Sequence, residues 1–182
     1  MVQRLHPAMF LMSGPSAAGK STVARLLAQR FSRGVHLEGD IFRRSIVSGR
    51  EDPLPAALPE AERQLRLRYR IAADAADHFF AEGFSVVLED VMAGPLLAEC
   101  AGLVRSRPLH VVVLLPAADV IAARDASRKH SGYAVWSVQE LHDLFAVQTP
   151  RLGLWLDNSG QTPAQTVDEI LLRVQQAHPP GV

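Results

Sequence analysis

An uninterrupted G-x-x-x-x-G-K-S pattern lies near the start of the chain, from Gly14 to Ser21. Its glycines allow successive backbone N–H groups to turn toward one phosphate, and the dipole of a following helix adds positive potential there. Lys20 can then reach the β- and γ-phosphates, and the Ser21 hydroxyl can bind Mg²⁺. A plain glycine turn between a strand and a helix would explain neither residue. We therefore predict a nucleoside triphosphate site formed by Gly14, Pro15, Ser16, Ala17, Ala18, Gly19, Lys20, Ser21 and Thr22.

Acidic residues follow two other short apolar runs. Asp40 comes after Gly39, and we predict that it accepts a proton from a substrate hydroxyl; orienting Mg²⁺ and capping a helix are the alternative roles. Asp90 ends a run as a Walker-B carboxylate does, so we predict that it holds Mg²⁺ together with Ser21. Glu89 is its close rival, and a capping or surface ion-pair role stays open for both. The predicted acceptor-binding residues are Asp40, Arg43, Arg44, Glu89 and Asp90.

Arg124 and Arg128 lie four residues apart in a helical pattern, so both project from one face. We predict that they bind nucleotide phosphates and that Arg128 neutralises charge on the transferring phosphoryl group. A solvated charged face is the alternative. The arginines of a longer helical pattern are expected to face solvent, although Arg70 or Arg43 could meet an anionic substrate group; this longer set is Arg63, Arg66, Arg68 and Arg70.

Composition restricts the class of partner. With 19 basic and 19 acidic residues, the chain has no overall field that would attract nucleic acid or an anionic membrane. One cysteine, Cys100, excludes an internal disulfide and a C-x-x-C site. No signal peptide and no apolar stretch of about 18 residues is present, so we expect a cytoplasmic protein with a small-molecule substrate.

The seven histidines lack metal-ligand spacing, and packing roles are expected for His36, His78 and His110. The sequence leaves the oligomeric state open.

Apolar β-rich runs alternate with helical patterns, which is typical of a parallel sheet covered by crossover helices. We expect strands at residues 8–12, 35–38, 84–88, 109–115 and 152–156, with 109–115 at the centre of the sheet. Helical patterns follow Ser21, span residues 60–82, and begin again after Pro116 and at Thr162-Pro163. Residues 51–59 are expected to form a loop, and the tail after Ala177 to be disordered. Residues 1–182 are expected to form one domain.

These residues resemble the small P-loop kinases of the nucleoside-monophosphate-kinase-like fold, and within them the chloramphenicol-phosphotransferase-like group. The resemblance is carried by residues 14–21, Gly39-Asp40, Glu89-Asp90-Val91 with Gly94, and the lid arginines. It implies an α/β fold of three αβα layers, with a five-stranded parallel sheet in the order 2-3-1-4-5 and a small helical lid at about residues 124–136. It also implies ATP as donor, Asp40 as general base, and contacts of Arg124 and Arg128 with adenine and phosphates. Residues 42–53 are more basic than an apolar drug pocket would require.

The expected function is an ATP- and Mg²⁺-dependent phosphotransferase, a kinase that transfers the γ-phosphate to a hydroxyl of an antibiotic, sugar or nucleoside-like metabolite. A nucleotide-binding switch or slow ATPase is an alternative, although no Asn-Lys-x-Asp guanine-reading motif occurs. A polynucleotide kinase is a third hypothesis. The neutral net charge disfavours it, because binding a phosphate backbone normally requires a basic surface.

Overall fold

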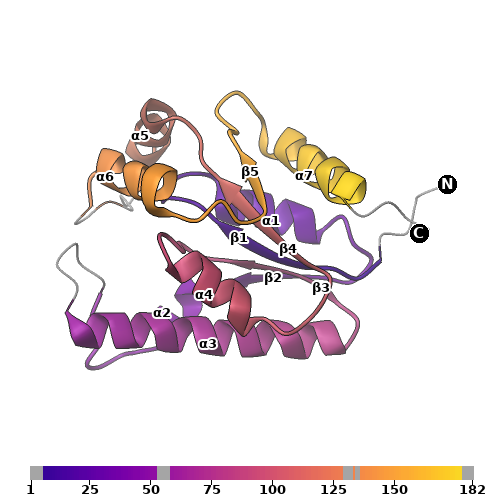
Figure 1. The fold of residues 1–182 in the computed structure, drawn as a ribbon, viewed down its shortest axis with the longest axis horizontal. Coiled ribbons are helices and arrows are strands. Elements are labelled where there is room, and N and C mark those ends of the chain that lie inside the picture. The colour runs from indigo at the N-terminus through magenta and orange to yellow at the C-terminus, as the bar shows by residue number, and fades with distance from the viewer. Residues whose placement is uncertain (1–5, 53–57, 129–132, 134–135, 178–182) are drawn as a thin grey trace.

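Five parallel strands form one sheet in the order β2-β3-β1-β4-β5, as the resemblance implied (Figure 1). The structure is a computed structural model that describes residues 6–52, 58–128, 133 and 136–177. Within them the strands are β1 (Met9–Ser13), β2 (Gly34–Glu38), β3 (Ser85–Glu89), β4 (Leu109–Leu114) and β5 (Leu154–Leu156). The α/β fold class and the sheet order are therefore confirmed.

The centre of the sheet is β1, which pairs with β3 on one side and with β4 on the other. All five residues of β1 are buried, whereas β4 begins with the partly exposed Leu109 and His110. The prediction that residues 109–115 form the central strand was wrong by one position. Apolarity does not separate a central strand from its neighbour, because helices cover both faces of each.

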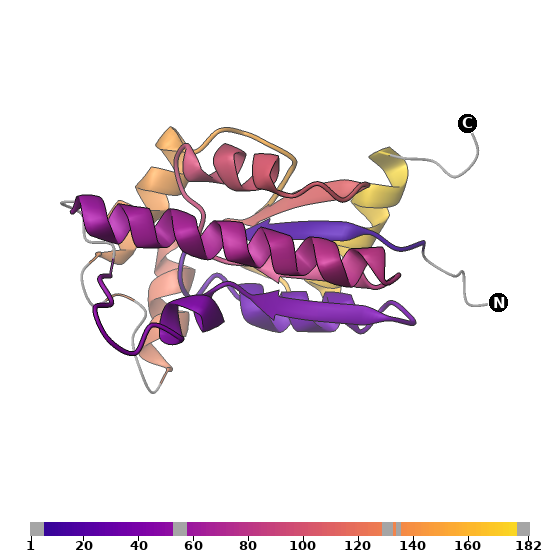
Figure 2. The same cartoon turned by 90° about the horizontal axis from the view of Figure 1, so that it is seen from below.

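Helices cover both faces of the sheet, which gives the three layers. The helices α1 (Lys20–Ala28) and α7 (Pro163–Ala177) pack on the face that carries Phe10 and Met12 of β1. The opposite face is covered by the long α3 (Pro59–Ala81), which lies in front of the sheet in Figure 2, by α4 (Leu96–Leu103), and by α6 (Val138–Asp143) with the following π-helical turn η1 (Leu144–Gln148).

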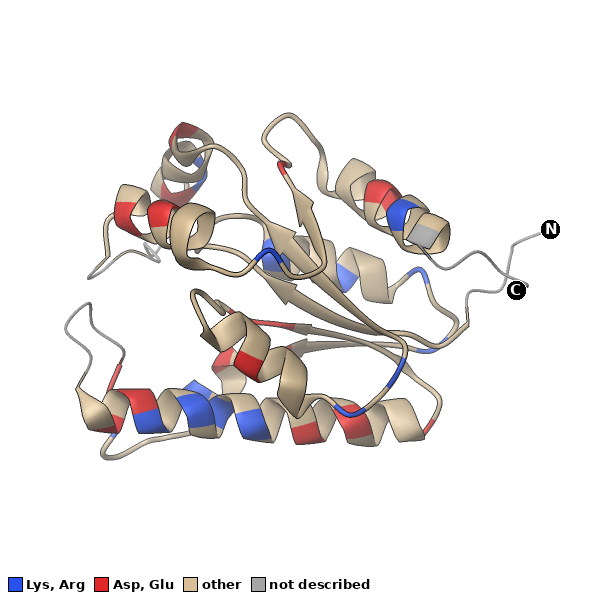
Figure 3. Cartoon of the chain, in the orientation of Figure 1, with Lys and Arg blue, Asp and Glu red and all other residues tan. Residues whose placement is uncertain are grey.

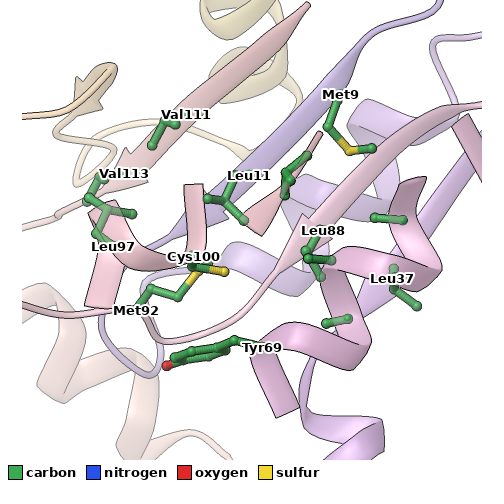
Figure 4. Close-up of a cluster of buried hydrophobic side chains, with 14 of the residues drawn as sticks. Met9, Leu11, Leu37, Tyr69, Leu88, Met92, Leu97, Cys100, Val111 and Val113 are labelled. Carbon is green, nitrogen blue, oxygen red and sulfur yellow. The ribbon is translucent and has the colours of Figure 1, made fainter. Parts of the chain in front are cut away.

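Alternation along β1 decides which side chains meet which helix layer. Met9 and Leu11 point to the side opposite Phe10 and Met12, as the period of two in a strand requires. Figure 4 shows Leu11 near Leu88 of β3, with Tyr69 of α3 below them. The Tyr69 hydroxyl donates to the Val91 carbonyl at 2.7 Å, so α3 is held against the segment that follows β3.

The remaining helices lie at the edge formed by the carboxyl ends of the strands. α2 (Asp40–Arg44) directly follows β2, and α5 (Ala118–Ala126) follows β4. In Figure 3 the strands are almost entirely free of charged residues, while the helices carry most of them. None of the helices in the described part of the chain is long and apolar enough to cross a membrane.

The predicted helices and strands agree with the structure to within one or two residues at their ends, but α4, α6 and η1 were not predicted. Of the predicted lid, residues 129–132 and 134–135 lie outside the described residues, as do residues 53–57 of the predicted loop and the tail after Ala177.

Candidate active site

Residues 14–19, between β1 and α1, are here called the phosphate loop, and three of them have positive φ values. Gly14, Ala17 and Gly19 have φ values of 144°, 59° and 97°. A Cβ atom on Gly14 would lie 2.2 Å from the carbonyl oxygen of Leu114 in β4, so no larger residue fits there. Alternating positive and negative φ values turn consecutive N–H groups to one side, and the start of α1 adds its dipole. The loop therefore forms an anion-binding concavity.

Lys20 is the first residue of α1, and its side chain turns back over the loop. The Nζ donates to the Pro15 carbonyl at 3.0 Å, and the residue is 8% exposed. Burial lowers the pKa of this amine, while the carboxylates of Glu89 and Asp90 act in the opposite direction. A buried ammonium with one carbonyl partner has donors left for phosphate oxygens.

Ser21 was predicted to act together with Asp90, but its side chain contacts Glu89. Its hydroxyl donates to Glu89 Oε1 at 2.6 Å. Burial opposes ionisation of Glu89, but His36, Lys20 and Ser21 together hold the pKa of its carboxyl below the ordinary value. Glu89 ends β3 on the α1 side of the sheet, where Val87 also points. An ionised carboxylate thus faces Ser21, in the first turn of α1.

Asp90 points to the other side of the sheet, because successive side chains of a strand alternate. Its Oδ1 accepts from Arg68 Nη2 at 2.9 Å and from the Val91 N–H at 2.7 Å. Its Oδ2 has no hydrogen-bond partner among the described residues. A Cβ atom on Gly39 would lie 2.1 Å from this oxygen, so the glycine before Asp40 makes room for Asp90. Burial raises the pKa of Asp90 to about 6, although Arg68 opposes the shift.

Arg68 was predicted to face solvent with the other arginines of α3, and this was wrong. Its side chain is 10% exposed and lies between two carboxylates, with Nη1 at 3.9 Å from Asp40 and Nη2 at 2.9 Å from Asp90. By contrast, Arg63 is exposed and pairs with Glu60, and the partly exposed Arg66 pairs with Glu62 and Glu99. Arg68 therefore links the two acidic positions predicted from the sequence.

Asp40 is the first residue of α2, and the N-cap position is Gly39. Its carboxylate accepts from Arg43 Nε at 2.6 Å and lies 3.5 Å from Arg44 Nε. Burial acts to raise the pKa of Asp40, but Arg43 and the other arginines outweigh it and lower this pKa. Asp40 is therefore ionised at neutral pH and acts as a hydrogen-bond acceptor at the edge of the site.

The two arginines predicted to face the phosphate loop both contact it, Arg124 from the last turn of α5 and Arg128 from the segment that follows this helix, so the prediction that both lie on one helix was wrong for Arg128. Arg124 donates to the Ala18 carbonyl at 3.3 Å and to the Asn158 carbonyl at 3.0 Å. Arg128 Nη1 donates to the Ser16 hydroxyl at 3.4 Å. Two residues that were not predicted as site residues join them, although Tyr133 lies in the predicted lid: Asn158 Nδ2 donates to the Ala18 carbonyl at 3.0 Å, and the Tyr133 hydroxyl donates to the Ser16 carbonyl at 2.7 Å. The position of Asn158, just after the fifth strand, is the signal that could have indicated its role.

A cleft of about 550 Å³ joins these groups, a size suited to small ligands. One part of its wall is apolar and includes Trp136 and Leu141. The predicted site residues that line it are Ser16, Ala17, Gly19, Lys20, Ser21, Asp40, Arg43, Arg44, Glu89, Asp90 and Arg128, and Arg68 lines it as well. Thr22 is exposed on α1 and does not belong to the described lining, nor do Gly14, Pro15, Ala18 and Arg124.

The three histidines for which a packing role was predicted have different environments. His110 packs against Phe10, with ring centroids 5.2 Å apart. His78 is exposed on α3, so the prediction was wrong there. His36 lies on β2 with Nε2 3.8 Å from Glu89 Oε1, close to the phosphate loop.

A family model described as an AAA domain matches residues 9–143, a range that includes the phosphate loop and both predicted acidic positions. The chain belongs to this AAA domain family. None of the curated proteins matches its sequence.

Several solved structures of similar fold are named as kinases. An unliganded sugar kinase from Janibacter sp. HTCC2649 is 20% identical with a TM-score of 0.69, over 93% of this chain and 95% of the other. The Deinococcus radiodurans tunicamycin resistance protein is 16% identical with a TM-score of 0.64, over 92% and 95%. The Mycobacterium tuberculosis APS kinase, in complex with AMPPNP and APS, is 16% identical with a TM-score of 0.63, over 93% and 98%. At these identities the likeness confirms a P-loop kinase-like fold.

Proposed function

We propose that this protein is an ATP- and Mg²⁺-dependent kinase that transfers the γ-phosphate of ATP to a hydroxyl of a small molecule. The observation that carries the proposal is the shared cleft, because the phosphate loop with Lys20 and Asp40 with the arginines of α2 all line it. A phosphate donor and a hydroxyl acceptor held in one cleft would react with little loss of entropy. We also propose that residues 1–182 form one cytoplasmic domain without nucleic-acid or membrane partners.

Triphosphate binding is assigned to the backbone N–H groups of the phosphate loop and to Lys20. Lys20 would exchange its contact with the Pro15 carbonyl for the β- and γ-phosphates. Arg128 reaches the same loop from the segment after α5, through its contact with Ser16, and would neutralise charge on the group being transferred. Arg124 would hold the loop and the start of the β5 to α7 connection together, since it bonds Ala18 and Asn158.

Mg²⁺ fits the residues that surround Ser21. Hydroxyl and carboxylate oxygens are the donors that Mg²⁺ prefers, and the Ser21 hydroxyl and the ionised Glu89 carboxylate lie 2.6 Å apart. Glu89 is therefore the better metal candidate than Asp90, whose bonded oxygen is engaged by Arg68. Bound Mg²⁺ would neutralise charge on the β- and γ-phosphate oxygens.

Asp40 is proposed as the group that accepts the proton of the acceptor hydroxyl. In the transfer, the bond between the γ-phosphorus and its bridging oxygen breaks, a bond to the acceptor oxygen forms, and the hydroxyl proton passes to Asp40. The lowered pKa of Asp40 makes it a weak base, so its effect depends on orienting the hydroxyl and on taking the proton late in the transfer. Arg68 acts as a positioning residue between Asp40 and Asp90.

The residues that line the cleft indicate the chemical class of the acceptor. Paired arginines and carboxylates around Asp40 provide donors and acceptors for several hydroxyl groups, and Trp136 with Leu141 provides an apolar surface. These walls suit a polar compound with several hydroxyls and one apolar face.

The test is a screen of ATP consumption by the purified protein across hydroxyl-bearing compounds, with mass spectrometry for a product heavier by one phosphate. Phosphate on an acceptor, lost in Lys20→Ala, is the expected result. If the protein hydrolyses ATP but phosphorylates no acceptor, the kinase assignment is wrong and the slow ATPase alternative takes its place.

A further inference from the structure

Three side chains with metal-binding atoms gather on the α1 side of the sheet, next to the phosphate loop. They are His36 and Glu38 of β2 and Glu89 of β3, and their ligand atoms all lie within 4.8 Å of one another. His36 and Glu38 are two residues apart on one strand, and the strand register pairs Glu38 with Glu89. The pleat therefore points all three side chains to the same face.

The environment of His36 does not satisfy its imidazole. Nε2 is inaccessible to solvent and has no hydrogen-bond partner among the described residues, and the side chain is 15% exposed. The nearest oxygen, Glu89 Oε1, is 3.8 Å away, which is beyond hydrogen-bond length. A buried nitrogen near two carboxylates thus lacks a partner that the protein itself supplies.

A divalent ion would supply that partner. Bonds from a transition metal to imidazole nitrogen and to carboxylate oxygen are about 2.0–2.2 Å long, so two ligands of one ion can lie up to about 4.2 Å apart. The distance from His36 Nε2 to Glu89 Oε1 falls within this limit. Glu38 has the most exposed side chain of the three, and its contact with Arg44 is a weak surface pair at 3.5 Å. The Glu38 carboxylate can therefore approach the other two ligands, from a separation of at most 4.8 Å to the limit of about 4.2 Å for two ligands of one ion.

We propose that His36, Glu38 and Glu89 bind a first-row transition-metal dication such as Mn²⁺, Co²⁺ or Zn²⁺. One imidazole nitrogen with two carboxylates is a donor set for these ions, whereas Mg²⁺ and Ca²⁺ take oxygen donors. Three protein ligands leave coordination positions for water or another oxygen. Because Glu89 also accepts from Ser21, the ion would lie at the edge of the phosphate loop.

The test uses the nucleotide-free full chain, so it does not depend on the proposed kinase activity. Co²⁺ is titrated with its visible absorption as the readout, Zn²⁺ and Mg²⁺ by calorimetry. The variant is His36→Gln, and its matched control is His78→Gln, at an exposed histidine of α3. We expect one Co²⁺ per wild-type chain, the same in the control, and affinity for Co²⁺ and Zn²⁺ at least about tenfold weaker in His36→Gln. Weak Mg²⁺ binding should not change.

Glu38→Gln provides a second variant, because its side chain is partly exposed and its replacement tests the site even if His36→Gln does not fold. It should also weaken Co²⁺ affinity about tenfold or more. Co²⁺ binding as tight in these variants as in the wild type, or no Co²⁺ binding by the wild type, overturns the proposal. A protein that binds Co²⁺ through His36 but phosphorylates nothing would refute the kinase and keep the metal site.

Discussion

Arg68 Nη2 lies 2.9 Å from Asp90 Oδ1, and the side chains are 10% and 7% exposed. The pair joins the middle of α3 to the residue that follows β3, and both side chains line the cleft. Removing one partner of a buried ion pair leaves an uncompensated charge, which costs more than the intact pair contributes.

We therefore predict that Arg68→Met lowers the free energy of unfolding by about 3 kcal/mol at pH 8. Without the guanidinium, the buried Asp90 carboxylate has lost its cation, so the loss should shrink toward pH 5 as the carboxyl takes up a proton. Urea denaturation at the two pH values measures both quantities. Arg66→Met, at a partly exposed arginine two residues earlier, should change stability by less than about 1 kcal/mol.

The double variant Arg68→Met/Asp90→Asn extends this test, because neither charge then remains. Its stability should lie closer to the wild type than that of Arg68→Met alone. If the losses of the two single variants simply add, Arg68 and Asp90 are not coupled.

The pKa of Asp90 predicts a pH dependence of stability. It is raised from 3.8 to about 6, so between these values the folded protein binds more protons than the unfolded chain does. The contribution of Asp90 to stability is therefore fully present below about pH 4 and is lost as the pH rises through about 6. Ionising it costs roughly 3 kcal/mol more in the folded state. The difference in unfolding free energy between the wild type and Asp90→Asn should change by that order from pH 4 to pH 7, and a constant difference would contradict the raised pKa.

Asp90 and Glu89 show what the sequence could and could not establish. Adjacent residues at the end of a strand point to opposite faces, so the sequence already indicates that they have different neighbours. It does not say which face α1 covers, because that depends on the packing of helices far away in the chain. For this reason Ser21 was matched with Asp90, while the structure brings it to Glu89. The metal assignment from sequence stays a prediction.

The strands and the phosphate loop were predictable because their signals are local: apolar runs, glycines and one motif. α4 escaped prediction because Leu96–Leu103 is apolar on most sides and lacks the polar stripe of a surface helix. Arg68 escaped because a helix with arginines at four positions looks solvated. Its burial arises from β3 and α2, which lie against α3 in the fold.

Asp40→Asn should reduce turnover by about a hundredfold or more while ATP binding stays near normal. The change removes the acceptor of the hydroxyl proton and leaves the phosphate loop intact. Steady-state kinetics with an acceptor found in the screen, together with ATP titration, separates the two effects. Asp119→Asn, at an exposed aspartate of α5, is the control and should leave both unchanged. Normal turnover in Asp40→Asn would assign Asp40 a structural role with Arg43 and Arg44.

Arg128→Ala should lower turnover by about a hundredfold, the scale of losing one preorganised donor to the transferring group. The arginine contacts Ser16 of the phosphate loop, so its charge is close to the bound phosphates in the proposed complex. The same kinetic assay applies, with Arg173→Ala on α7 as control, since Arg173 pairs with Glu169 on that helix. Equal turnover in both variants would remove Arg128 from the catalytic residues.

Calorimetric titration of the purified protein with ATP in the presence of Mg²⁺ tests the central claim most directly, because every assigned role depends on a triphosphate in the phosphate loop. We predict saturable binding of one ATP per chain, and its loss or strong weakening in Lys20→Ala, which removes the buried ammonium. The absence of measurable affinity for either ATP or GTP, with a divalent ion supplied, would contradict the account.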